Sequence, residues 1–289
     1  MTRRLLIPIA FALSILAPVL VQSSAASAQA SKSKAVAPAP PVAAPCPQFT
    51  LGGQAPSGGA TGRILCHSFY VINYSTTLRD PLWTSYRLTR EMAQGGDRIG
   101  RFPGPFRQDP ALTAADQGAH SDYTNASPAF DRGHLTPAND AIDMPHQSDT
   151  FVVTNIVPQA GLFNRGVWRL LEAAVHGLAL QEGDVYIVTG ATFVANPPLM
   201  HRSGRADRIA VPAATFKAIY VPSRNAAIGY YATNVHPTTC TMMSIAELTR
   251  RTGVNPFPSL PAAATASLPA FTVPAQPPEC RVAAAGGGR

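Results

Sequence analysis

The chain has 289 residues and a formal net charge of +7, a length that allows one large domain or two small ones around a substantial core. The positive charge suits a polyanionic partner, but it suits many exported proteins equally well and does not by itself single out nucleic acid. The four cysteines include no Cys-x-x-Cys pair, which argues against a zinc ribbon or a thioredoxin-type site.

The first thirty residues have the order of a secretory signal peptide. Arg3 and Arg4 precede an apolar run over residues 5–21, and small residues then lead to Ala30, near which we expect cleavage. An uncleaved membrane anchor is the alternative, but a span needs about 20 apolar residues and this run is shorter and contains prolines. We therefore expect an exported protein, periplasmic or secreted, with no membrane segment after residues 1–30 are removed.

Composition divides the rest of the chain into three parts. Residues 31–45 are rich in Ala and Pro without periodicity, which predicts an extended, disordered tether. The folded body is expected over residues 46–260. Residues 261–289 form a second Ala/Pro-rich stretch, which we expect to be tied back to the body by a disulfide.

The cysteines are even in number, and in an oxidising compartment they are expected to form two disulfides. The sequence permits three pairings. We favour Cys46 with Cys66 and Cys240 with Cys280, because short loops close with less loss of entropy.

In chain order, five runs enriched in β-branched or aromatic residues predict strands. They are residues 64–74, 83–88, 184–193, 216–221 and 228–233. A helix is predicted over residues 164–180, where apolar residues recur on one face, and a second helix from Ser244 to just before Gly253, with Ser244 and Glu247 as a capping box. The elements do not alternate regularly, so the fold class is α+β with a central mixed or antiparallel sheet.

Between these elements, residues 95–149 are polar and irregular, and long irregular connections often carry function. Phosphodiester hydrolysis needs a base for the attacking water and positive charge for the phosphate. The stretch Asp131-Arg132-Gly133-His134 supplies a histidine, the natural base near neutral pH, and an arginine that can fork onto phosphate oxygens. Taken alone, this pattern is more often a solvated turn.

A second motif follows about thirty residues later, with Asn155-Ile156-Val157-Pro158-Gln159 leading to Asn164. With about 100° per residue, Asn164, Trp168 and Glu172 form one stripe beside the apolar face of the predicted helix. The amide oxygen of Asn164 could bind a hard cation such as Mg²⁺ while water supplies most other ligands.

These motifs, in this order and spacing, resemble the DNA/RNA non-specific endonucleases of the ββα-metal (His-Me finger) class, which includes endonuclease G. Weaker similarities extend from about residue 70 to residue 260, at residues 106–109, 122–123, 188–190 and 252–257. The resemblance implies a ββα-metal finger, in which a strand ends near His134, a second strand runs through residues 154–157, and a helix opens at Asn164.

The same resemblance implies a role for each residue of the site. His134 would be the general base and Asn164 the sole direct protein ligand of Mg²⁺, with Mn²⁺ or another hard divalent cation as an alternative. Arg132 would stabilise the transition state, while Asn155 and Glu172 would organise the site, Glu172 through metal-bound water. Arg107 is a further expected phosphate contact, although the residues before it do not match the family pattern.

The family cuts DNA and RNA to leave 5′-phosphate ends, and no base-reading motif is evident in this chain, so binding is expected through the phosphate backbone and should weaken with salt. Purely structural roles are the alternative for these residues: Asn155 could only hydrogen-bond a turn, and Glu172 could be a solvated helix residue. Trp168 is expected to pack in the core. A catalytically weak nucleic-acid-binding protein on the same fold and a small-substrate phosphodiesterase are the alternative functions. The oligomeric state is not predicted.

Overall fold

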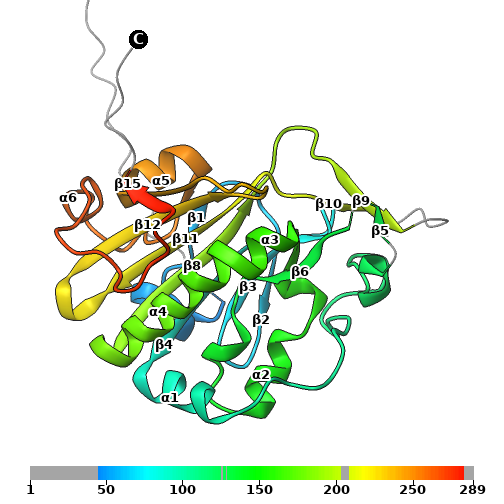
Figure 1. The fold of residues 1–289 in the computed structure, drawn as a ribbon, viewed down its shortest axis with the longest axis horizontal. Coiled ribbons are helices and arrows are strands. Elements are labelled where there is room, and N and C mark those ends of the chain that lie inside the picture. Colours follow the sequence, from blue (N-terminus) through cyan, green and yellow to red (C-terminus); the bar gives the residue numbers. More distant parts are fainter. Residues whose placement is uncertain (1–44, 125, 128, 203–207, 283–289) are drawn as a thin grey trace, which may run out of the picture. The chain divides into compact units, whose positions relative to one another are not determined.

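The computed structural model describes residues 45–124, 126–127, 129–202 and 208–282, so the predicted signal peptide lies outside the described residues, as does the tether up to residue 44. The centre of the fold is a large sheet (Figure 1). Its eight strands, in spatial order, are β15 (Cys280–Val282), β13 (Cys240–Met243), β12 (Ala226–Thr233), β11 (Ala214–Val221), β8 (Asp184–Thr192), β4 (Asp80–Thr89), β3 (Val71–Ser75) and β2 (Arg63–Cys66). All neighbours are antiparallel except β13 and β15, so the mixed sheet predicted from the sequence is confirmed.

Four of the five predicted strands are confirmed as β4, β8, β11 and β12. The prediction of one strand over residues 64–74 is wrong, because β2 and β3 form a hairpin there. The chain reverses between them, and the His67 N–H donates to the carbonyl of Tyr70 at 2.9 Å. The turn contains the polar residues His67 and Ser68 but no Gly, Pro or Asn, so the sequence carries only a weak signal that divides the run.

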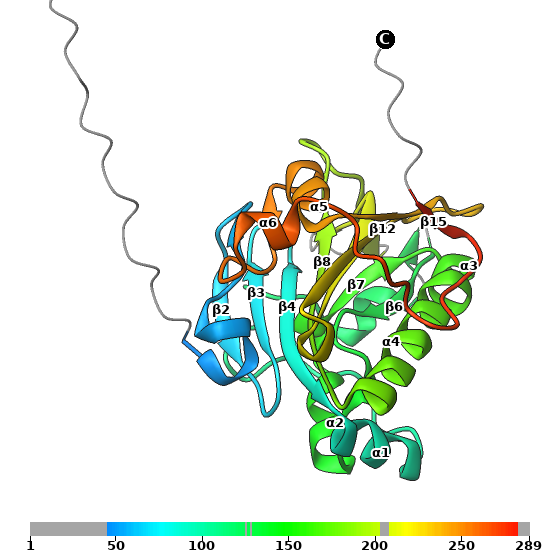
Figure 2. The ribbon, with the colours of Figure 1, turned by 90° about the vertical axis from the view of Figure 1, so that its left-hand side faces the viewer.

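Helices cover both faces of the sheet (Figure 2). On one face lies α4 (Arg169–Glu182), which buries Leu171, Ala174, Val175 and Leu178 in the larger core cluster. On the other lies α5 (Ile245–Thr252), which contributes Ile245 and Leu248 to a second cluster. The predicted helix over residues 164–180 is confirmed, but its first five residues, Asn164–Trp168, form a wider π turn. The predicted capping of α5 is also confirmed, since the Ser244 hydroxyl accepts from the Glu247 N–H at 3.1 Å.

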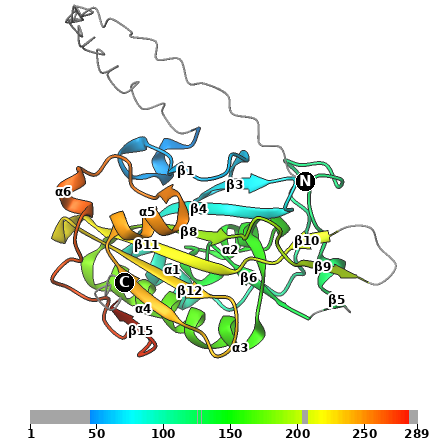
Figure 3. The same ribbon diagram turned by 90° about the horizontal axis from the view of Figure 1, so that it is seen from above.

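Smaller elements surround this frame. The remaining helices are α1 (Arg90–Arg98), α2 (Met144–Thr150), α3 (Gly161–Phe163) and α6 (Ala262–Thr265). Short 3₁₀ turns lie at Pro47–Phe49, Leu51–Gly53, His120–Tyr123, Ala138–Asp140, Val153–Asn155 and Pro222–Arg224. The minor sheets pair β1 (Ser57–Gly58) with β14 (Val254–Asn255), β9 (Leu199–Arg202) with β5 (Ala126–Ser127) and β10 (Arg208–Ala210), and β6 (Asp131–His134) with β7 (Ile156–Gln159). Figure 3 shows β5, β9 and β10 at the opposite end of the fold from α5 and α6.

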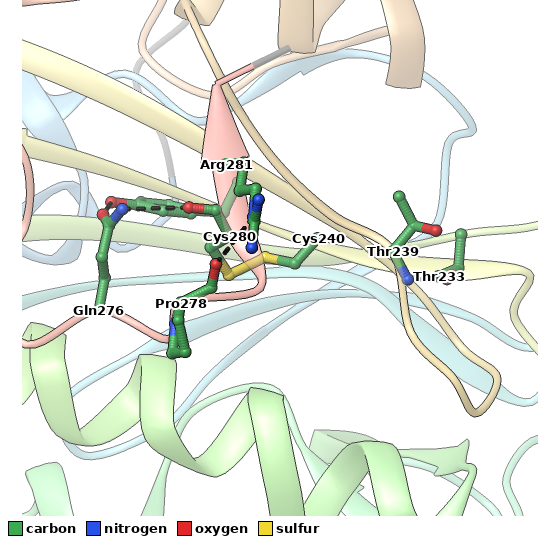
Figure 4. The surroundings of a disulfide bond; sticks show 8 residues. Thr233, Thr239, Cys240, Gln276, Pro278, Cys280 and Arg281 are labelled. Carbon is green, nitrogen blue, oxygen red and sulfur yellow. Dashed lines mark hydrogen bonds between the residues drawn. A yellow bond between two sulfur atoms is a disulfide. The ribbon is translucent and has the colours of Figure 1, made fainter. Parts of the chain in front are cut away.

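The cysteine pairing favoured from the sequence is confirmed. Cys46 is bonded to Cys66, and Cys240 is bonded to Cys280 across the parallel pair β13 and β15 (Figure 4). The second bridge fixes the last described strand of the chain to the edge of the main sheet. Within the described ranges, none of the helices has the length and apolar character needed to cross a membrane.

Candidate active site

The two short strands β6 and β7 place the first predicted residue of the site. They pair antiparallel, with His134 opposite Ile156 at the end of β6. The strands approach closely at Gly133, where a side-chain carbon would lie 2.0 Å from Oε1 of the buried Gln159. Glycine at this position therefore allows Gln159 to pack beneath β6 and keeps His134 at the strand end.

The imidazole of His134 is held in an aromatic setting. Its ring centroid lies 5.1 Å from that of Phe106 and 5.2 Å from that of Phe151. Burial, together with the positive charge of Arg101, lowers the pKa of His134 to about 3. Its Nε2 is buried and has no hydrogen-bond partner among the described residues. His134 is therefore neutral near pH 7, the state in which an imidazole carries a lone pair that can accept a proton.

Asn164 begins the π turn that leads into α4. Its Nδ2 donates to Oδ2 of Asp131 at 3.1 Å, and Oδ1 of Asp131 accepts from Nη1 of Arg165 at 3.2 Å. Because the amide nitrogen is engaged in this way, the amide orientation is fixed and Oδ1 of Asn164 is left as an acceptor. Asp131, the first residue of the β6 motif, thus links that strand to the start of the helix.

Two adjoining hollows meet at these residues. We call them the Asn164 pocket, of about 250 Å³, and the His176 pocket, of about 260 Å³. Both are lined by Arg101, His134, Arg169 and Glu172. The Asn164 pocket is completed by Arg132, Asn164 and Arg165, and the His176 pocket by Pro137, Ala138, Asn139, Asp140, Ala173 and His176. The structure thus brings four of the predicted site residues, His134, Arg132, Asn164 and Glu172, to one hollow.

Glu172 is a half-buried residue in the shared lining of the two pockets, with charged groups around it. Burial raises its pKa to about 7, against the lowering effect of Lys217 and with a further raising effect of Asp140. Lys217 is itself buried on β11, where its Nζ donates to Oγ1 of Thr189 at 2.7 Å and lies 5.1 Å from the ring centre of Trp168. Burial lowers the pKa of Lys217. Its charge therefore partly compensates that of Glu172 through the interior of the protein.

Arg132 and Asn155 hold their places in different ways. Arg132 lines the Asn164 pocket, while its Nη2 donates to the His120 carbonyl at 3.1 Å and burial lowers its pKa. Asn155 is buried and lines neither pocket. Its side chain accepts from the Thr136 N–H at 2.9 Å and donates to the carbonyls of Thr136 and Thr150, each at 3.0 Å. Asn155 thus fastens the loop that follows His134.

Arg107 lines neither pocket, although the ring of its neighbour Phe106 packs against His134. Its Nη1 donates to the Ser148 carbonyl at 2.5 Å and its Nη2 pairs with Asp149 at 3.1 Å, and neither pocket includes it. Arg101 instead lines both pockets, with its guanidinium 5.0 Å from the ring centre of Phe151. No local pattern around Arg101 distinguishes it, because its position depends on the path of the irregular loop.

The motifs also did not indicate three other residues at or near the site, Lys217, Asp140 and His176. Lys217 had one signal, since it is a lone charge within an otherwise apolar strand, between Phe216 and Ala218. Asp140 and His176 are hydrogen-bonded to each other at 2.8 Å, but their sequence separation of 36 means that no local pattern indicates this contact.

Two strands and a helix that direct His134 and Asn164 to one hollow form the ββα arrangement of metal-dependent nucleases. The residues fit a hard divalent cation, since the Asn164 pocket offers an amide oxygen and a carboxylate and lacks thiolate. Within the ranges that the structure describes, no group of three or more His, Cys, Asp or Glu side chains could hold a metal.

Comparisons with known proteins agree with this class. The family described as DNA/RNA non-specific endonuclease matches residues 53–263. Nuclease C1 of Cunninghamella echinulata var. echinulata is 30% identical over 237 residues, which cover 76% of this chain and 90% of that protein. The nuclease of Serratia marcescens is 29% identical, over 61% of this chain and 65% of its own length. Human mitochondrial endonuclease G is 30% identical, over 52% of each chain.

Among solved structures, that of an EndoG/EndoGI complex superposes with a TM-score of 0.65 at 24% identity, covering 74% of this chain and 93% of that one. At this identity the likeness concerns the fold. The chain belongs to the DNA/RNA non-specific endonuclease family. The resemblance found in the motifs is thereby confirmed.

Proposed function

We propose that this protein is an exported, sequence-nonspecific endonuclease that hydrolyses phosphodiester bonds of DNA and RNA with a single Mg²⁺ and leaves 5′-phosphate ends. The observation that carries the proposal is that two residues lining one hollow each have an acceptor atom with no hydrogen-bond donor among the described residues. These are Nε2 of the neutral His134 and Oδ1 of Asn164, whose amide is oriented by Asp131. Membership of the nuclease family supports the same activity.

The chain's own residues divide the chemistry of hydrolysis among themselves. His134 accepts a proton from the attacking water, which its lowered pKa allows throughout the neutral range. Arg132 and Arg101 place positive charge where the phosphate gains negative charge in the transition state. Asn164 would hold Mg²⁺, or Mn²⁺ in its place, with Glu172 beside it, and the bound ion would supply further positive charge at the scissile phosphate.

Binding is directed to the sugar–phosphate backbone. Four arginines line the Asn164 pocket, namely Arg101, Arg132, Arg165 and Arg169. Arginine forks suit phosphate oxygens and do not distinguish bases, so affinity should fall with salt and vary little with sequence. DNA and RNA are therefore both substrates of the proposed reaction.

Export is proposed from the signal-peptide pattern of residues 1–30 and is supported by the two disulfides, which persist in oxidising compartments. The names of the similar proteins do not all indicate export, since one of them is a mitochondrial endonuclease G. We propose that this protein is periplasmic or secreted.

The test is cleavage of plasmid DNA and of RNA by the purified protein, with Mg²⁺ and with EDTA, beside His134→Ala. We expect both polymers to be degraded with Mg²⁺, degradation to stop in EDTA, and His134→Ala to lose at least about a hundredfold of the rate. The exposed His236→Ala serves as a matched control and should retain the wild-type rate. Cleavage that persists in EDTA or in His134→Ala contradicts the mechanism. Hydrolysis of only a small chromogenic phosphodiester would identify a phosphodiesterase.

A further inference from the structure

The His176 pocket adjoins the proposed hydrolytic site and has no role in it so far. It shares the wall that contains His134 with the Asn164 pocket. The rest of its lining includes the small or apolar residues Pro137, Ala138 and Ala173, the last of which belongs to α4. A substrate strand whose scissile phosphate lies at His134 therefore has an adjoining hollow for the next part of the strand.

The interior of this pocket is suited to a neutral group. Asp140 is buried, and both of its carboxylate oxygens are engaged, Oδ2 with the Tyr86 hydroxyl at 2.6 Å and Oδ1 with Nδ1 of His176 at 2.8 Å. Glu172 adds a second acidic group to the lining. Two carboxylates disfavour a phosphate inside the pocket, whereas the apolar walls and the small Ala173 leave room for a sugar and a base.

The mouth of the pocket carries the opposite charge. Arg169 is exposed, and its Nε donates to the Arg165 carbonyl one helical turn earlier at 3.1 Å. This bond directs the side chain along the helix and leaves both terminal nitrogens as donors. Arg101 lies at the same boundary. Neither guanidinium forms an ion pair with a carboxylate of the residues that the structure describes.

We propose that the His176 pocket is a nucleoside subsite, and that Arg169 binds the phosphate that follows this nucleoside along the strand. The inference rests on the proposed function, because it takes the scissile phosphate to lie at His134. It makes the preferred substrate a strand with at least two consecutive phosphodiesters. Arg169 is then a residue that determines preference for chain length, and it acts on a phosphate that is not cleaved.

The test compares a substrate with one phosphodiester, the dinucleoside monophosphate TpT, with a fluorescent hexathymidylate. Arg169→Gln removes the phosphate contact, and Ala173→Phe fills the pocket from an exposed helical position without changing charge. We expect Arg169→Gln to lower kcat/KM for hexathymidylate about tenfold, mainly through KM, and to lower kcat/KM for TpT by a smaller factor. Ala173→Phe should lower kcat/KM for both substrates, because TpT also places one nucleoside beside the scissile phosphate. Arg250→Gln and Ala246→Phe, both at exposed positions of α5 on the other face of the sheet, are the matched controls and should change neither value.

Binding in EDTA gives a readout that does not depend on cleavage. The anisotropy of hexathymidylate should report weaker binding by Arg169→Gln, with a slope of log affinity against log salt reduced by about one, and weaker binding by Ala173→Phe with an unchanged slope. Wild-type discrimination between TpT and hexathymidylate in Arg169→Gln, or wild-type kcat/KM for both substrates in Ala173→Phe, with unaltered binding, overturns the subsite. If both variants bind hexathymidylate more weakly as expected, but the wild-type protein cleaves no strand with Mg²⁺, the proposed function is refuted and the subsite is retained.

Discussion

Asp131 offers a sharp test of how the site is assembled, because it touches the proposed metal ligand without being one itself. Its two carboxylate oxygens accept from Nδ2 of Asn164 at 3.1 Å and from Nη1 of Arg165 at 3.2 Å. Asp131→Ala removes the acceptor that orients the amide. The side chain of Asn164 can then rotate and present its NH₂ group to the cation in place of its oxygen.

The size of the effect follows from the strength and exposure of this contact. Removing a group that orients a metal-binding side chain costs about 10- to 100-fold in metal affinity or activity. The Asp131 side chain is 25% exposed, so solvent weakens the bond and we expect the lower part of that range, about 10- to 30-fold or ~1.4–2 kcal/mol. Asp131→Asn retains an acceptor oxygen but not the charge, and should lose about threefold.

The assay is the initial rate of plasmid cleavage as a function of Mg²⁺ concentration. We expect Asp131→Ala to raise the Mg²⁺ concentration needed for half of the maximal rate, and saturating Mg²⁺ to restore most of the rate. Arg165→Gln removes the other partner of Asp131 and, being 68% exposed, should shift the Mg²⁺ requirement less than Asp131→Ala does. An unchanged Mg²⁺ requirement in Asp131→Ala would refute the proposed role of Asn164 and of its orienting bond.

Two further predictions concern stability. Because the unfolded chain protonates His134 near pH 6.5 and the folded protein resists protonation down to about pH 3, the stability due to the neutral ring is present above pH 6.5 and is lost as the pH falls below it. The free energy of unfolding should fall by up to ~1.4 kcal/mol per pH unit in this range. In urea unfolding with EDTA present, the free energy of unfolding of His134→Gln should therefore depend less on pH than that of the wild type. Equal pH dependence in the two proteins would contradict the buried neutral ring. Replacing both Cys240 and Cys280 by alanine opens a loop with a sequence separation of 40 and should lower the free energy of unfolding by about 4 kcal/mol, measured from the urea midpoint, whereas a change below about 1 kcal/mol would refute this reading.

The parts of this protein that the sequence predicts well are those set by local pattern. The strands β8, β11 and β12 follow from runs of β-branched and aromatic residues, and α5 from its capping box. His134 and Asn164 come from short motifs, and the structure places both in the lining of the Asn164 pocket although α2, β7 and α3 lie between them in the chain.

What the sequence could not give are contacts made by chain folding over long separations. Arg107 was expected at the phosphate; the structure pairs it with Asp149 and places Arg101, which the motifs did not indicate, in the lining of the Asn164 pocket. The influence of Lys217 on Glu172 joins two elements of different type across the core. Neither outcome is encoded in a periodicity, because both depend on how the irregular segment and β11 pack against α4.

The π turn at Asn164–Trp168 has a consequence for how this site tolerates change. A π turn holds one residue more than the α-helical hydrogen-bonding pattern accommodates, and at Gly166 the backbone leaves helical geometry, with φ −101° and ψ −109°. Deleting one residue here would let the turn revert to regular helix and improve its backbone bonding. It would also rotate Asn164 by about 100° about the helix axis relative to Glu172. The shorter chain would thus form a more regular helix in which Asn164 no longer lines the pocket that it shares with His134, so the extra residue sets the angular register of the site.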